Sequence, residues 1–167
     1  QQAGELAVKT FIESFTRIDG DIKDCMRTAL EEADAAIASD KEKNPMLSEM
    51  GCTLVAVWVV NGEVYWASVG DSPLWLIRNG ALKRLNEDHS MRPLLEGLVE
   101  LGRMTPEELE TDKRSNVLRS ALKGDELALV DVSSMKDSLQ PGDVLVSASD
   151  GLETLSTEAI RDIVVEN

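Results

Sequence analysis

The sequence is poor in three residue types that often define a small protein: it has two cysteines, one histidine and 4% aromatic residues. Cys25 and Cys52 lie far apart with no CxxC pairing, so they predict no disulfide framework and fit a reducing compartment such as the cytoplasm. The single histidine, His89, excludes a metal site built from several histidines. No apolar run reaches the roughly 18 residues of a membrane span, and no secretory signal is visible at the start.

Positive charge is scarce as well, with 17 basic residues against 31 acidic ones and a formal net charge of −14. A surface of this sign repels phosphate backbones and anionic membranes, so we expect neither nucleic acid nor a membrane as a partner. An excess of carboxylates suits a divalent cation, although most acidic side chains form a solvated face. At 167 residues and 43% hydrophobic, the chain predicts one domain with a sizeable core.

The first quarter of the sequence has helical periodicity. Apolar residues recur at helical spacing over residues 4–18 and again over residues 21–39, which predicts two amphipathic helices. Asp21 is placed to cap the second helix, which we expect to run antiparallel to the first. Residues 40–50 contain a proline and read as a polar connection.

The pattern then changes to that of strands. Residues 53–60 form a β-branched, almost entirely apolar run, which predicts a strand buried on both faces. Asn61-Gly62 and Asn79-Gly80 are strong hairpin turns. They predict an antiparallel meander of four strands, whose later members are residues 64–69, 74–78 and 81–85.

Residues 87–115 hold two short helical pieces, and Thr105-Pro106 is a good start for the second of them. Strand-like segments then return, followed by one more helix. The predicted strands are residues 116–122, 126–132 and 143–148, and the predicted helix is residues 156–165.

Two aspartates follow predicted strands, each beside a glycine. Asp150 comes after the apolar run 143–148 and precedes Gly151, while Asp71 follows Gly70 between two hairpin strands. Taken singly, each reads as an ordinary turn aspartate. Two such strand ends in one small antiparallel domain favour an oxygen-only site for Mg²⁺ or Mn²⁺, ions that keep several waters. For Asp71 and Asp150, two readings therefore stay open here, a turn residue or a metal ligand.

The remaining side chains that could take part in catalysis or binding are expected to be structural. His89 has no partner signature for acid–base work, so we expect it to be structural or exposed. Neither cysteine has a basic neighbourhood that would lower its pKa, so both read as small core residues. The three tryptophans on adjacent hairpin strands predict core or cross-strand packing; they are Trp58, Trp66 and Trp75.

Read in order, a series of short segments resembles the metal-dependent protein phosphatases of type 2C. The segments are Gly4-Glu5, Ala33-Asp34-Ala35-Ala36-Ile37, Gly51-Cys52-Thr53, Val69-Gly70-Asp71-Ser72, Arg78-Asn79-Gly80, Asn86-Glu87-Asp88-His89-Ser90, Asn116-Val117-Leu118-Arg119-Ser120-Ala121-Leu122, Pro141-Gly142-Asp143 and Ser149-Asp150-Gly151. The resemblance covers residue 4 to about residue 164. The spacings between the segments match the family as well as the segments themselves do. Bacterial serine/threonine phosphatases look nearest, and the stage II sporulation protein E branch belongs to the same superfamily.

This resemblance implies an α+β fold, a four-layer αββα sandwich in which two antiparallel sheets are flanked by helices. It implies two Mn²⁺ or Mg²⁺ ions that share a water, which attacks phosphorus directly in a phosphoserine or phosphothreonine protein. Asp150 resembles a core metal ligand, and Asp71 resembles the aspartate that binds a third, weaker ion with it in bacterial members. Residues 88–115 resemble the flap beside the active site. A cognate Ser/Thr kinase or its targets would be partners.

The sequence also departs from the family pattern. An Asp-Gly metal motif should precede Gly4 and an Asp-Asn motif should follow residue 167, so we expect residues 1–167 to be one phosphatase domain without its N- and C-terminal strands. Gln1, Cys52 and Pro73 stand where the family usually has histidine, threonine and arginine. Two functions therefore stay open: an active phosphatase, or a catalytically inactive regulatory or binding module of the same fold.

Overall fold

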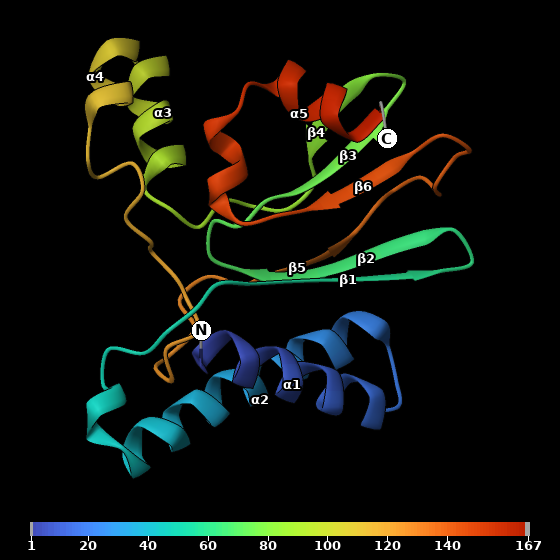
Figure 1. Ribbon diagram of the computed structural model, residues 1–167, viewed down its shortest axis with the longest axis vertical. Helices are drawn as coiled ribbons and strands as arrows, with labels where there is room; N and C mark the ends of the chain where they lie inside the picture. Colours follow the sequence, from blue (N-terminus) through green and yellow to red (C-terminus); the bar gives the residue numbers. More distant parts are fainter. Residues whose placement is uncertain (1, 166–167) are drawn as a thin grey trace.

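The chain forms four layers in the computed structural model, which describes residues 2–165 (Figure 1). Two antiparallel helices, α1 (Gln2–Arg17) and α2 (Ile22–Lys43), cover the outer face of one sheet, and α5 (Thr157–Val165) lies over the other (Figure 1). The predicted α+β sandwich of two antiparallel sheets flanked by helices is confirmed. Among residues 2–165, no helix combines the length and the apolar character needed to cross a bilayer.

Within residues 2–165 each sheet has three strands, and every pairing is antiparallel. The first sheet contains β1 (Leu54–Val60), β2 (Glu63–Val69) and β5 (Asp131–Ser134), in the order β1-β2-β5. The second contains β3 (Leu74–Arg78), β4 (Ala81–Arg84) and β6 (Val144–Ser147), in the order β4-β3-β6. The predicted single meander of four strands is therefore wrong, because the chain changes sheets over residues 70–73, hereafter the crossover loop.

The two predicted Asn-Gly turns join the strands within each sheet. Asn61 and Gly62 have φ values of 51° and 80°, and Asn79 and Gly80 have 51° and 75°. Positive φ at both central residues matches the twist of hairpin strands, and asparagine and glycine adopt it at low cost. Local chemistry thus fixes the β1–β2 and β3–β4 hairpins.

The first two helices extend beyond their predicted bounds. Helix α1 begins at Gln2, so Gly4 lies inside it. Asp21 caps α2 as predicted, since its carboxylate accepts hydrogen bonds from the backbone N–H groups of Lys23 and Asp24. Helix α2 then continues through four residues of the expected polar connection to Lys43. It ends there because a residue before proline disfavours helical angles, and Pro45 begins a 3₁₀ turn, η1 (Pro45–Leu47).

Alternating side chains of the first sheet enter two different cores. In β2, Ala67 and Val69 face the α1–α2 layer, whereas Val64 and Trp66 face the second sheet. This two-sided burial explains why β2 is apolar over most of its length. The prediction that residues 53–60 are buried on both faces is wrong for most of β1, which lies at the sheet edge and is buried only at Leu54.

The segment between α4 and β5 differs most from prediction. Residues 116–122 form no extended strand and make only isolated bridges, at Ser90–Leu118 and Cys52–Leu122. Strand β5 begins at Asp131 rather than near residue 126. The hydroxyl of Ser120 donates to the carbonyl of Leu129 and accepts from its N–H, so a side chain takes the place of strand pairing here.

Asp34, a buried residue of α2, anchors this segment to the helical layer. Its Oδ1 accepts hydrogen bonds from the backbone N–H groups of Lys123 and Gly124, both at 2.8 Å. Gly124 has a φ of +75°, and a Cβ there would lie 2.5 Å from the Cα of Ala38. Only glycine lets the turn approach the helix so closely.

Residues 88–115 contain two short helices that stand at one end of the sandwich (Figure 1). They are α3 (Arg92–Glu100) and α4 (Pro106–Thr111). The predicted start at Thr105 is confirmed, because Thr105 and Glu108 form a capping box. The predicted last helix corresponds to α5, which follows a 3₁₀ turn, η2 (Asp150–Thr154).

Replacing Asp34 by alanine would leave two partly buried N–H donors without their acceptor. We expect Asp34→Ala to lower the free energy of unfolding by roughly 1–3 kcal/mol in urea denaturation. Glu31→Ala, an exposed substitution on the same helix, should stay within about 0.5 kcal/mol of the unmodified protein. Equal losses in the two variants would contradict the anchoring role of Asp34.

Candidate functional site

A cavity of about 750 Å³ lies between residues 88–115 and the loops at one end of the sandwich. Its lining comes from four parts of the chain: the crossover loop, residues 84–96, the 110–116 region and η2. The lining residues are Asp71, Arg84, Asp88, Ser90, Arg92, Pro93, Glu96, Glu110, Asn116, Asp150, Gly151 and Thr154. Both aspartates predicted as metal ligands line it, so the structure brings together the two sites that the sequence separates.

Asp150 reaches the cavity from the second sheet. Strand β6 ends at Ser147, and Asp150 opens the η2 turn, where its side chain is exposed. The hydroxyl of Thr154 donates to the carbonyl of Gly151 at 2.8 Å and closes the turn. The carboxylate therefore stands at a tight bend just beyond a strand, as its sequence position predicts.

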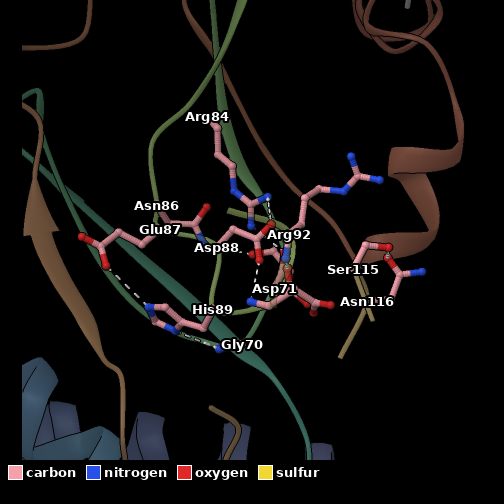
Figure 2. A network of polar contacts seen from close by, with 12 residues as sticks. Gly70, Asp71, Arg84, Asn86, Glu87, Asp88, His89, Arg92, Ser115 and Asn116 are labelled. Atoms are coloured by element: carbon pink, nitrogen blue, oxygen red, sulfur yellow. Dashed lines mark hydrogen bonds and ion pairs between the residues drawn. The ribbon is translucent and has the colours of Figure 1, made fainter. Parts of the chain in front are cut away.

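Asp71 reaches the cavity from the crossover loop, which joins the two sheets. Arg84 donates a hydrogen bond from Nη2 to the carbonyl oxygen of Asp71 at 2.5 Å, and its Nη1 lies 3.6 Å from Oδ2 of Asp88 (Figure 2). The hydroxyl groups of Ser72 and Thr53 are 2.8 Å apart and tie the loop to the start of β1. These contacts hold the backbone of Asp71 and leave its carboxylate at the cavity.

Negative charge dominates this cavity. Five carboxylates and two guanidinium groups are among the lining side chains. Burial raises the pKa of Asp71 above its usual range, repulsion from Asp150 and Asp88 raises it further, and Arg84 opposes the change. A cation bound between Asp71 and Asp150 would relieve this repulsion, because opposite charge favours the ionised carboxylate.

The donor set fits part of a hydrated divalent-cation site. Among residues 2–165, no three His, Cys, Asp or Glu side chains are grouped closely enough to hold a metal ion by themselves. Mg²⁺, however, commonly uses one or two carboxylates and keeps several waters. Asp71 and Asp150 therefore fit as two oxygen ligands of such an ion, and they do not form a complete protein site.

Arg92 is a lining residue that sequence reasoning missed. It begins α3, and its guanidinium lies 3.8 Å from Glu96 and 3.4 Å from Glu110, which links the two short helices. The Glu at i+4 and the neighbouring Pro93 at the helix start were the available sequence indications of its place. Its convergence on the cavity depends on how residues 88–115 fold back, which no local pattern reveals.

His89 is not among the residues that line the cavity. Its side chain is 1% exposed, and Nδ1 accepts a hydrogen bond from the N–H of Gly70 at 3.2 Å (Figure 2). Burial lowers the pKa of His89; Glu87, Asp131 and Asp88 act in the opposite direction, and Arg119 acts with burial. We predicted that His89 is structural or exposed, and the structure shows that it is buried.

Other side chains singled out by sequence lie outside the cavity. Trp66 is buried and donates to Oδ2 of Asp131 at 2.8 Å, as expected for packing. Trp58 is 43% exposed and packs edge-on against Phe15. Burial, followed by the charge of Asp34, raises the pKa of the Cys52 thiol, which disfavours a reactive thiolate.

The chain matches the model of the family described as protein phosphatase 2C over residues 5–97. It is 30% identical over 166 residues to the serine/threonine protein phosphatase PstP of Mycobacterium tuberculosis, covering 96% of this chain and 31% of that protein. It is also 30% identical over 170 residues to the serine/threonine phosphatase Stp of Listeria monocytogenes, covering 99% of this chain and 66% of the relative. The chain thus spans less than two thirds of each.

Two solved structures are similar in fold to this chain. The crystal structure of M. tuberculosis PstP has a TM-score of 0.77 at 30% identity, over 96% of this chain and 68% of that one. The catalytic domain of PstP in complex with two manganese ions has a TM-score of 0.73 at 27% identity, over 96% of this chain and 65% of that one. Similarity in sequence and similarity in fold therefore point to the same group of proteins.

The lowered pKa of His89 predicts how stability depends on pH. The folded protein binds this proton less readily than the unfolded chain, so acidification below the ordinary value of 6.5 favours unfolding. We expect the free energy of unfolding, measured in urea, to fall between about pH 7 and pH 5.5, where no other side chain of ordinary pKa titrates. The variant His89→Asn has no titrating group here and should show little loss across this window. A flat profile in the unmodified protein would contradict the prediction.

Proposed function

This chain belongs to the protein phosphatase 2C family, and we propose that it acts as a metal-dependent phosphatase on phosphoserine and phosphothreonine in proteins. The observation that carries the proposal is the convergence of Asp71 and Asp150, remote in sequence, on one acidic cavity. Bacterial relatives named as serine/threonine phosphatases support the reaction, and the manganese complex of PstP supports Mn²⁺ or Mg²⁺ as cofactor.

In this proposal Asp71 and Asp150 each supply carboxylate oxygens to divalent ions. Bound ions would lower the pKa of a water and neutralise charge on the phosphoryl oxygens. The chain places the two ligands on loops from different sheets, so the sandwich itself fixes their spacing. Asp150, at an exposed turn, is the proposed ligand of the core ions, and Asp71 is the proposed ligand of a third ion together with it.

Arg92 is placed to meet the phosphate of a substrate. A guanidinium presents paired N–H donors that match phosphate oxygens. Its present partners, Glu96 and Glu110, are half or more exposed, and exposed ion pairs contribute only about 0–1 kcal/mol. Exchanging them for a phosphate would therefore cost little. Residues 88–115 would then act as the predicted flap that contributes to substrate choice.

The alternative of an inactive module drew on three departures from the family pattern. Gln1 lies outside the described residues. Neither Cys52 nor Pro73 is among the residues that line the cavity, and Pro73 is buried. No observation in residues 2–165 therefore favours loss of activity over activity.

The expected substrates are phosphorylated proteins, among them the targets of a cognate Ser/Thr kinase. A cytoplasmic location fits two cysteines that remain free in the structure. The net charge of −14 argues against nucleic acid and anionic membranes as partners.

The proposal predicts Mn²⁺-dependent hydrolysis of p-nitrophenyl phosphate and of a phosphothreonine peptide by the full-length protein. We expect Asp150→Ala to lower kcat/KM by roughly 100-fold, because the ion contributes several kcal/mol to the transition state. Asp71→Ala should lose less, and the loss should shrink at higher Mn²⁺ concentration, since that ion is the weaker one. Asp19→Ala, an exposed aspartate outside the cavity lining, is the matched control and should retain full activity.

Two results would overturn this assignment. One is the absence of metal-stimulated turnover in the unmodified full-length protein; the other is an Asp150→Ala variant of it that is equally active. Calorimetry separates the alternatives, because an inactive regulatory or binding module that has lost its metals should show no Mn²⁺ binding in the millimolar range.

A further inference from the structure

The crossover loop carries Asp71 through a region where the backbone has no strand partner. Buried backbone polar groups must still be satisfied, and here a single downstream segment, residues 84–89, supplies most of the partners. The hydrogen bonds run from Gly70 N to His89 Nδ1, His89 N to Gly70 O, Arg84 Nη2 to Asp71 O, Asn86 Nδ2 to Ser72 O and Leu74 N to Asn86 Oδ1.

Within this set, His89 makes hydrogen bonds to both the N–H and the C=O of Gly70. Its own N–H donates to the carbonyl of Gly70 at 3.1 Å, and its imidazole Nδ1 accepts the Gly70 N–H at 3.2 Å. Accepting at Nδ1 places the proton of the neutral ring on Nε2. Among the described residues Nε2 has no hydrogen-bond partner, and its nearest charged neighbour is Glu87 at 3.8 Å. The contact to Gly70 is thus the one hydrogen bond that orients the ring.

Gly70 cannot be fixed by a side chain of its own. Its φ is +104°, and a Cβ there would lie 2.3 Å from Cγ2 of Thr53. The backbone turn therefore depends on outside contacts for its orientation. Asp71 is the next residue, so a rotation of the Gly70 peptide would turn the Asp71 carboxylate away from the cavity.

We propose that His89 is a positioning residue: its imidazole, acting as an acceptor at Nδ1, fixes the Gly70 peptide and thereby aims the Asp71 carboxylate into the cavity. The inference rests on the proposed function, in which that carboxylate helps to hold a divalent ion. The histidine touches neither substrate nor ion; it acts through the backbone of the residue before the ligand.

Two amide substitutions distinguish the effect of the hydrogen-bond acceptor at Nδ1 from the effect of side-chain volume. The side-chain oxygen of His89→Asn lies near the place of Nδ1 and can accept the Gly70 N–H, whereas the amide of His89→Gln extends toward the place of Nε2. We expect His89→Gln and His89→Leu to weaken Mn²⁺ binding, measured by calorimetry, by about 10-fold or more, as for other residues that orient a ligand. His89→Asn should bind Mn²⁺ nearly as the unmodified protein does.

A spectroscopic measurement tests the contact without metal or activity. In ¹⁵N-labelled protein, an N–H···N hydrogen bond transmits a scalar coupling between the Gly70 amide nitrogen and Nδ1 of His89. We expect this coupling in the metal-free protein. If His89→Leu does not fold, the comparison of Asn with Gln and this coupling still decide the matter.

Val64→Ala controls for simple loss of stability. Val64 is fully buried at the other end of β2 from the crossover loop, so its truncation destabilises the fold without touching Gly70. It should leave Mn²⁺ affinity unchanged. Equal weakening in Val64→Ala, or wild-type affinity in both His89→Gln and His89→Leu, would overturn the inference. Absence of Mn²⁺ binding in the unmodified protein would instead overturn the proposed function, and absence of the coupling in a protein that binds Mn²⁺ would overturn the positioning role alone.

Discussion

The chain leaves one sheet at Val69 and enters the other at Leu74, and most of the peptide groups in between join neither ladder. Side chains and backbone of residues 84–89 bind most of these groups instead, and the carbonyl of Pro73 accepts from the N–H of Ala148. This exchange is what allows two sheets to be joined by so short a connection. It also sets the location of the cavity, because the same connection carries Asp71 to the end of the sandwich.

Residues 84–89 link several parts of the molecule at once. Asp131 of β5 accepts hydrogen bonds from the Glu87 N–H and from the Trp66 indole, which ties the segment to the first sheet. Immediately afterwards the chain enters α3, where Arg92 lines the cavity. The end of β4 and the irregular chain that follows it therefore link a sheet, a cavity wall and a short helix, and hydrogen bonds maintain this stretch.

The parts of this fold that sequence predicts are those governed by local chemistry. The Asp21 cap, the two Asn-Gly turns and the Thr105 capping box each depend on residues a few positions apart. The convergence of Asp71 and Asp150 was also predicted, from two aspartates at strand ends together with the family resemblance. Family resemblance added the layer order.

Other parts depend on contacts between distant segments and could not be predicted. The sequence LVAVWVV indicates a strand buried on both faces, yet its exposure is decided by an edge position that only the sheet order reveals. Residues 116–122 have strand-like composition, but side-chain hydrogen bonds from Ser120 compete with pairing there. His89 gave no sequence indication of its acceptor role, since its partner is the backbone of a glycine.

Strand β1 has a consequence for the behaviour of the chain in solution. Within residues 2–165 it pairs only with β2, so seven consecutive apolar residues present one row of N–H and C=O groups at a sheet margin, with Trp58 and Val59 exposed beside it. Neither lysine nor proline interrupts that row, and these are the usual protections against edge-to-edge association. The margin is therefore the place where self-association, or the addition of a further strand, would begin.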